Sequence, residues 1–226
     1  MRRSAHKFGF ALWIAAASMC AVAIAFTCNV ASAHQTTIDR IVARVDTDII
    51  LLSDVRALQR YQQLVDGKSE SDAQILDRLI DQWIVRNEAE TARFPHPSED
   101  DVTRGVERVQ KSFTSPEEFE ARRKQIGLTD SDIRNMVSSQ LYLSNYLDSR
   151  FRPSARIEPK EVEDFYEKAV IPRAQARGQE PPSLDTARDY IHEALVQRSI
   201  NEQAELWLNE SRGRVHVTKL LEQSPQ

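Results

Sequence analysis

The chain has 226 residues, of which 41% are hydrophobic and 28% are charged, and its formal net charge is −4. A chain of this length can bury a sizeable apolar core without the help of a disulfide or a metal. Its acidic balance lacks the electrostatic footprint of a nucleic-acid-binding protein and disfavours attachment to an anionic membrane surface.

The first 33 residues have the three parts of a secretory signal peptide. Three basic residues precede an apolar stretch from Phe8 to Phe26, and Ala31-Ser32-Ala33 forms a small-x-small cleavage site. We expect cleavage after Ala33 and an exported protein without an integral membrane anchor; retention of the segment as an anchor is the alternative. Cleavage removes three basic residues and no acidic one, which takes the net charge from −4 to −7.

Both cysteines, Cys20 and Cys28, lie in this signal segment. The mature chain therefore has no thiol for a disulfide, for cysteine catalysis or for a thiolate metal site. It also has no Ser-His-Asp order, no phosphate-binding loop and no H-E-x-x-H motif. Its acidic clusters fall in the expected first turns of helices, where the helix dipole favours negative charge. The residues thus indicate no enzyme, no metal site and no cofactor.

Apolar residues alternate with other residues from 38 to 45, which predicts a half-buried strand. Asp46-Thr47-Asp48 should turn the chain, and residues 49–52 return to apolar surroundings. Ser53 is the expected N-cap of the first helix, and an apolar stripe continues that helix to Gly67.

Four further helices are predicted between residues 71 and 153, because polar N-cap residues precede apolar stripes at helical spacing. The last of the four has roughly 20 residues and should be about 30 Å long. Prolines at 95, 97 and 153 and a glycine at 127 are the expected stops. The expected N-caps are Ser71, Ser98, Ser115 and Thr129.

The C-terminal part should contain two more helices and a second strand. Glu158-Pro159 begins a sixth helix, and the proline-rich segment at about 171–183 is expected to be a linker or a frayed helix end. A long helix should follow from Ser183 to near Gly213, and alternation from Val215 to Leu220 predicts a strand. An isolated strand leaves its backbone groups unpaired, so the two predicted strands should pair with each other.

The expected fold is therefore mainly α. After the signal peptide (1–33), residues 34–226 should form a single helical domain. It would combine N-terminal helices (34–152) with a C-terminal helix and strand (183–226), and the N- and C-terminal strands would pair to close one module.

Five stretches of the chain, in this order, resemble the SurA-type periplasmic chaperones and their N-terminal domain family. They read IDRIVARVDTDIILLSDV, LDRLIDQWIVRNEAE, IGLTDSDIRNMVSSQLYLSNYL, IEPKEVEDFYEK and IHEALVQRSINEQAELWLNESRGRVHV. In that family one or two parvulin-type peptidyl-prolyl isomerase domains lie between the last two stretches. Here the intervening segment is shorter than the roughly 40 residues that a domain needs to fold unaided. We therefore expect a SurA-like helical core that lacks the isomerase domain and its activity.

The resemblance implies a periplasmic holdase that works without ATP and binds unfolded outer-membrane or exported proteins. Such a protein needs a cleft with adaptable apolar side chains and a polar rim. The alternatives are a dedicated scaffold for one envelope partner and a degenerate isomerase subunit. The sequence leaves open which clients bind, whether the chain forms a homo-oligomer, and which helix faces form the cleft.

Six side chains are candidates for client binding. Phe113 and Phe119 flank the Ser115-Pro116 turn, where a neighbouring helix would cover aromatic rings less easily. The other four lie on the predicted fifth helix, where a position in the core is the alternative for each. These four are Met136, Tyr142, Tyr146 and Phe151.

Overall fold

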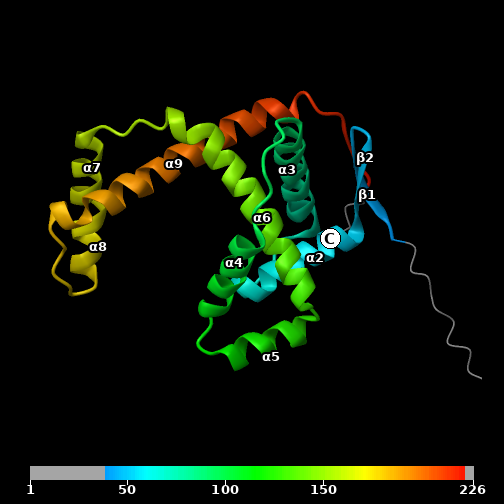
Figure 1. Ribbon diagram of the computed structural model, residues 1–226, viewed down its shortest axis with the longest axis horizontal. Coiled ribbons are helices and arrows are strands. Elements are labelled where there is room, and N and C mark those ends of the chain that lie inside the picture. Colours follow the sequence, from blue (N-terminus) through cyan, green and yellow to red (C-terminus); the bar gives the residue numbers. More distant parts are fainter. Residues whose placement is uncertain (1–38, 222–226) are drawn as a thin grey trace, which may run out of the picture. The chain divides into compact units, whose positions relative to one another are not determined.

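The structure is a computed structural model that describes residues 39–221. The predicted signal peptide lies outside the described residues. Within residues 39–221 the chain is mainly helical with one small antiparallel sheet (Figure 1), which confirms the predicted fold class. No helix in this range combines the length and the apolar character that crossing a membrane requires.

The sheet joins the two ends of the described chain. Its strands are β1 (Ile41–Val45), β2 (Asp48–Leu51) and β3 (Val217–Lys219), in the order β2-β1-β3. Ala43 lies opposite Lys219, and Val45 lies opposite Val217, so the predicted pairing of the N- and C-terminal strands is confirmed. Strand β2, which the sequence pattern does not predict, folds back on β1 as the second half of a hairpin.

The hairpin turn also binds the C-terminal segment. Asp46 has a φ of 50°, a left-handed conformation that aspartate tolerates better than most residues. Its N–H donates to the carbonyl of His216 (2.9 Å), and its Oδ1 accepts from the N–H of His216 (2.8 Å). A single acidic turn residue thus fixes both the hairpin and the register of β3.

Five helices follow the hairpin. Each of the expected N-caps Ser71, Ser98, Ser115 and Thr129 accepts a hydrogen bond from the backbone N–H three residues later, as predicted. These caps begin the second to the fifth helix of the group. The helices are α2 (Leu52–Asp66), α3 (Asp72–Thr91), α4 (Glu99–Lys111), α5 (Pro116–Ile126) and α6 (Asp130–Phe151).

The predicted N-cap of the first of these helices is wrong. Helix α2 begins at Leu52, directly after β2, so Ser53 lies inside its first turn. The Asp54 carboxylate accepts from the N–H of Leu51 (2.9 Å) and takes the capping role, while the N–H of Ser53 donates to Asp39 (3.2 Å). The strand continues to Leu51, which leaves no room for a separate cap.

After a short 3-10 turn at Arg152–Ser154, the C-terminal part contains α7 (Pro159–Phe165), α8 (Ile171–Ala176) and α9 (Leu184–Arg212). A π-helical segment, Tyr166–Val170, connects α7 directly to α8. The first six residues of the segment expected to be a linker are therefore helical, and only residues 177–183 are not. The hydroxyl of Tyr166 donates to the carbonyl of Pro182 (2.6 Å) and holds this non-helical segment against the π-helical one.

The buried apolar residues form three clusters. The first contains β1, α3, the middle of α6 and the end of α9; the second lies among α2, α4, α5 and the start of α6; the third joins α7 to the start of α9. Helix α6 contributes to two clusters through Val137 and Tyr146, and α9 to two through Ile191 and Trp207. The two longest helices thus join the three clusters, because each of them has residues in two clusters.

Candidate functional site

Helices α4 and α6 approach each other closely at one glycine. A Cβ atom at Gly105 would lie 2.5 Å from Cγ1 of Val137 and 3.2 Å from Cδ1 of Leu141. An isolated glycine inside a helix reduces stability relative to alanine, so its presence here has a packing reason. Gly105 allows the side chains of α6 to lie against the backbone of α4.

A pocket of about 260 Å3 is present at this contact, between α2, α4 and α6. We call it the α4–α6 pocket. It has an apolar wall and a polar rim, which are the two features that a client-binding cleft requires. The wall includes Val109, Val137 and Leu141, and the rim includes Arg108, Gln140 and Ser144.

Two hydrogen-bonded residues, Tyr61 and Gln140, lie between this pocket and a second one. Tyr61 is only 5% exposed, and its hydroxyl donates to Oε1 of Gln140 (3.2 Å). Burial raises the pKa of this hydroxyl. Both residues also line a pocket of about 330 Å3 between α2 and α3. Val65, which is 42% exposed, lines that second pocket together with Arg78. The Tyr61–Gln140 pair thus lies between a mainly apolar pocket and a more polar one.

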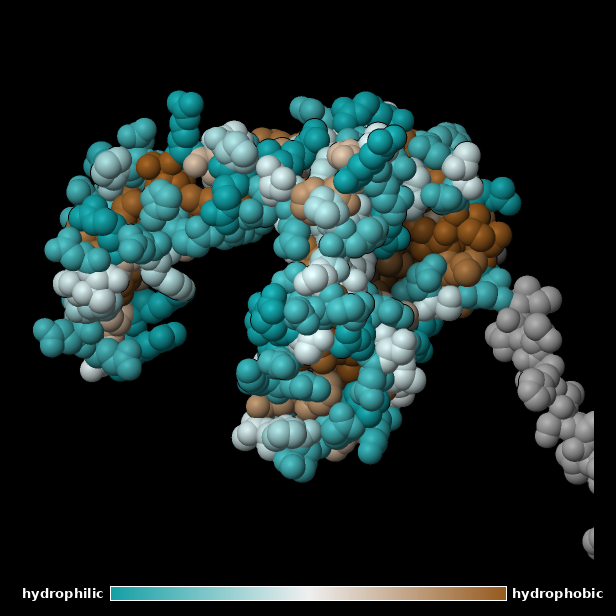
Figure 2. Space-filling view, in the orientation of Figure 1, coloured by the Kyte–Doolittle hydropathy of each residue, from teal (hydrophilic) through white to brown (hydrophobic). Residues whose placement is uncertain are grey.

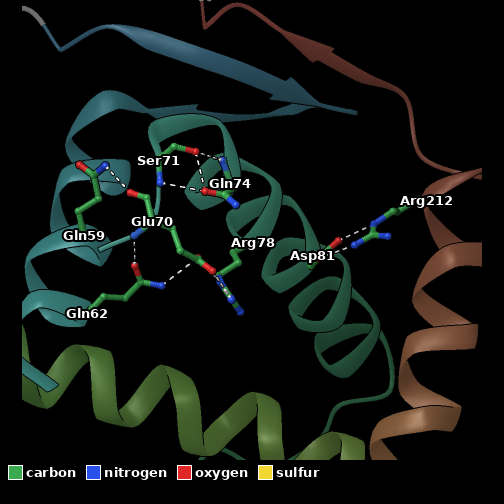
Figure 3. A network of polar contacts seen from close by, with 8 residues as sticks. All are labelled: Gln59, Gln62, Glu70, Ser71, Gln74, Arg78, Asp81 and Arg212. Carbon is green, nitrogen blue, oxygen red and sulfur yellow. Dashed lines mark hydrogen bonds and ion pairs between the residues drawn. The ribbon is translucent and has the colours of Figure 1, made fainter. Parts of the chain in front are cut away.

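A network of polar contacts orders the polar side of the second pocket (Figure 3). Arg78 donates from Nε and Nη2 to the two carboxylate oxygens of Glu70, at 2.5 and 2.6 Å. Gln62 donates to the same carboxylate (3.0 Å) and accepts from the backbone N–H of Glu70 (3.1 Å). These contacts lower the pKa of Glu70 to about 2, chiefly through the hydrogen bonds from Arg78. The loop between α2 and α3 is therefore held by a charge-neutral pair.

This pair should make stability depend on pH in a defined direction. The pKa of Glu70 is lower in the folded chain, about 2, than its ordinary value of 4.5. Its stabilising contribution is therefore complete above pH 4.5 and is lost as the pH falls toward 2. Glu70→Gln should lower the melting temperature at neutral pH, and the difference from the wild type should shrink as the pH falls toward 2. Thermal unfolding followed by circular dichroism across this range measures both.

The matched control for this prediction is Glu107→Gln, which removes an exposed carboxylate 3.6 Å from Lys111 on the outer face of α4. An exposed pair of this kind contributes little to stability. A difference between Glu70→Gln and the wild type that stays constant with pH would contradict the assignment.

The structure does not bring the six predicted client-binding residues together. Phe119, Tyr142 and Tyr146 are 2%, 4% and 5% exposed and belong to the apolar clusters. A core position was the alternative for Tyr142 and Tyr146, whereas Phe119 was expected to be less covered by its neighbours. The remaining three are half-buried and pack against the same clusters: Phe113, Met136 and Phe151. None of the six lines the α4–α6 pocket or the second pocket.

Sequence reasoning missed the residues that do line the pockets. Val109 and Leu141 appear in the sequence as ordinary members of apolar helical stripes. The signal that could have singled them out is Gly105, since a glycine within a helix often marks a close approach to another helix.

Large hydrophobic side chains are also exposed in a few places. Figure 2 shows hydrophobic residues gathered over the sheet on the visible face. Among the described residues, the exposed large hydrophobics are Ile49, Val65, Tyr190, Leu206 and Leu220. Ile49 belongs to β2, and Leu220 is the residue directly after β3.

Residues 39–221 contain no group of three or more His, Cys, Asp or Glu side chains that could hold a metal ion.

Comparison with known proteins gives a distant similarity. No protein-family model matches the chain. The chain is similar to chaperone SurA of Pseudomonas fluorescens (strain Pf0-1), with 24% identity over 149 residues. The match covers 62% of this chain and 35% of the relative, so the chain spans about a third of the length of that protein. The similarity supports a distant relationship to SurA.

Proposed function

We propose that the protein is a periplasmic holdase chaperone that binds unfolded outer-membrane or exported proteins without ATP and without isomerase activity. The observation that carries the proposal is the similarity to a chaperone SurA. The α4–α6 pocket supports it, because an apolar wall with a polar rim can take apolar side chains from many sequences.

The energetics of the pocket suit reversible holding. Full burial of one large apolar side chain contributes roughly 1.5 to 3 kcal/mol, which by itself corresponds to binding weaker than about 1 mM. A client would therefore be held by several such contacts and released by losing them one at a time. The exposed amide of Gln140 at the rim can bind backbone groups of a client without reading its sequence.

Suppression of aggregation tests the proposal. Purified protein comprising residues 34–226 is mixed with a urea-denatured outer-membrane β-barrel protein during dilution into buffer without ATP, and light scattering is recorded. We expect suppression near a stoichiometric ratio that extends to unrelated barrels. The absence of suppression, combined with one tight and saturable partner recovered from the periplasm, would favour the dedicated scaffold instead.

A pair of matched variants assigns the activity to the α4–α6 pocket. Val109 and Val106 lie on the same helix and are both half-buried, but only Val109 lines the pocket. Val109→Ser should reduce suppression severalfold, whereas Val106→Ser should retain it with a similar loss of stability. Equal suppression by the two variants would place client binding elsewhere on the protein.

A further inference from the structure

Strand β3 is an edge strand, and its outward backbone groups have no partner in the part of the chain that the structure describes. The N–H of Leu220 donates to the carbonyl of Val42 (2.8 Å), and the carbonyl of His216 accepts from Asp46 (2.9 Å). Hydrogen-bonding direction alternates along an antiparallel strand, so the N–H and C=O groups of Val217 and Lys219 point away from β1. Within residues 39–221 these four groups have no hydrogen-bond partner. They form a template for one more strand.

A pocket of about 630 Å3 adjoins this edge, and we call it the edge pocket. Ile80 of α3 lies in its lining together with Val215 and Val217. The side chains of Val217 and Lys219 lie on the same face of the sheet as the buried Ala43 and Val45, which are opposite them in β1. An added strand would therefore project every second side chain on the face of the sheet that borders the edge pocket.

The charges that line the edge pocket are paired. Arg212, at the end of α9, donates to both carboxylate oxygens of Asp81, at 2.7 and 2.5 Å (Figure 3). Lys219 forms an ion pair with Asp77. An entering apolar or aromatic side chain would thus meet an apolar centre between two neutralised pairs rather than an unpaired charge.

Lysine on an edge strand commonly prevents the approach of another strand. Here the Lys219 ammonium is bound to Asp77 of α3, so it lies on the core-facing side and leaves the edge itself open. The opposite edge of the sheet differs, because the register between β1 and β2 shifts between Ile41 and Ala43. Irregularities of this kind discourage strand addition. The β3 edge is therefore the better template of the two.

We propose that the β3 edge binds an extended segment of an unfolded client by strand addition, with one apolar or aromatic side chain of the segment in the edge pocket. This inference rests on the proposed chaperone function. Two donors and two acceptors of β3 bind the client backbone whatever its sequence, and the edge pocket selects an apolar residue at alternate positions. Strands of outer-membrane barrels have this alternating pattern.

A second copy of the chain is a poorer occupant of this edge. Strand β3 has three residues, and a stable interface buries at least about 1,200 Å2 in total. Binding of a client segment requires only a short stretch and is strengthened by the contacts that the same client makes elsewhere.

Amide hydrogen exchange gives a direct test. The probe is a ten-residue peptide that alternates tyrosine or valine with threonine, added to the protein comprising residues 34–226 and followed by nuclear magnetic resonance. We expect the peptide to slow exchange of the Val217 and Lys219 amides by about tenfold or more, and to change that of Thr218 little, because its N–H faces β1. The same peptide with one central residue replaced by proline should protect neither amide.

Two substitutions at one position isolate the backbone contribution. Lys219→Ala and Lys219→Pro both remove the ion pair with Asp77, but only proline removes the outward N–H. Lys219→Pro should bind the peptide about tenfold more weakly than Lys219→Ala, measured by fluorescence anisotropy, with melting temperatures within a few degrees of each other. Equal affinities of the two variants would overturn the inference.

The outcomes separate this inference from the proposed function. Suppression of aggregation without protection of Val217 and Lys219 would overturn strand addition and leave the holdase standing. Protection by the peptide without suppression of aggregation would overturn the holdase and leave strand addition at the β3 edge standing. Protection that depends on protein concentration and not on the peptide would assign the edge to a second copy of the chain and overturn the inference.

Discussion

Deletion of residues 214–226 is expected to lower the midpoint of thermal unfolding by about 8 to 16 °C. Hydrogen bonds to the β1–β2 hairpin would be lost: the two between Asp46 and His216, the one from Leu220 to Val42, and those of the β1–β3 ladder. Each contributes roughly 1 kcal/mol. Loss of the apolar contacts of Val215, Val217 and Leu221 with the first cluster adds to this. A total of roughly 4 kcal/mol corresponds to a shift of about 8 to 16 °C for a chain of this size.

The control for this deletion is a chain that ends at residue 221, which retains every contact named above. Thermal unfolding of both truncated chains, followed by circular dichroism, measures the contribution of β3 alone. If the chain lacking residues 214–226 melted at the same temperature as the control, the C-terminal strand would not be an integral part of the fold.

The pairing of the two terminal strands could be predicted because it follows from elimination. Only two alternating segments were recognised in the sequence, and neither could leave its backbone groups unpaired. The helix starts at Ser71, Ser98, Ser115 and Thr129 could be predicted because capping depends on residues within one turn. These features depend on local sequence or on a small number of possible partners.

The sequence predictions were wrong where the conformation of a segment depends on an adjacent strand. The segment 48–51 is too short to show the alternation of apolar and polar residues that is typical of a strand. It forms a strand because β1 lies beside it. Ser53 has the chemistry of an N-cap, but β2 continues to Leu51 and the cap passes to Asp54. Neither outcome can be obtained from the propensities of the residues themselves.

The candidate site was less predictable than the fold. An apolar stripe shows that a helix has a buried face, but it does not show which neighbour covers each residue. Tyr142 and Val137 both lie on the apolar face of α6; Tyr142 packs in the first cluster and Val137 borders the α4–α6 pocket. The difference depends on where α4 crosses α6, and Gly105 sets that crossing.

Replacement of Phe119 by alanine is expected to reduce the free energy of unfolding by about 3 to 5 kcal/mol. Phe119 is 2% exposed and packs in the second cluster, with its ring 5.4 Å from that of Phe113 in an edge-to-face arrangement. If both rings were available for clients, as expected from the sequence, a double replacement would leave stability almost unchanged. The structure predicts instead that Phe119 carries most of the loss. Urea unfolding of Phe119→Ala and Phe113→Ala separates the two contributions.

The smaller loss is expected for Phe113→Ala, because Phe113 is only half-buried. A loss below about 1 kcal/mol for Phe119→Ala would contradict its burial in the second cluster. This result also governs how client-binding data are interpreted. The second cluster holds together α2, α4 and α6, which form the α4–α6 pocket. Under the proposed function, Phe119→Ala would therefore weaken client binding by disordering the pocket. Only a variant such as Val109→Ser, compared with Val106→Ser at matched stability, can assign a contact with the client.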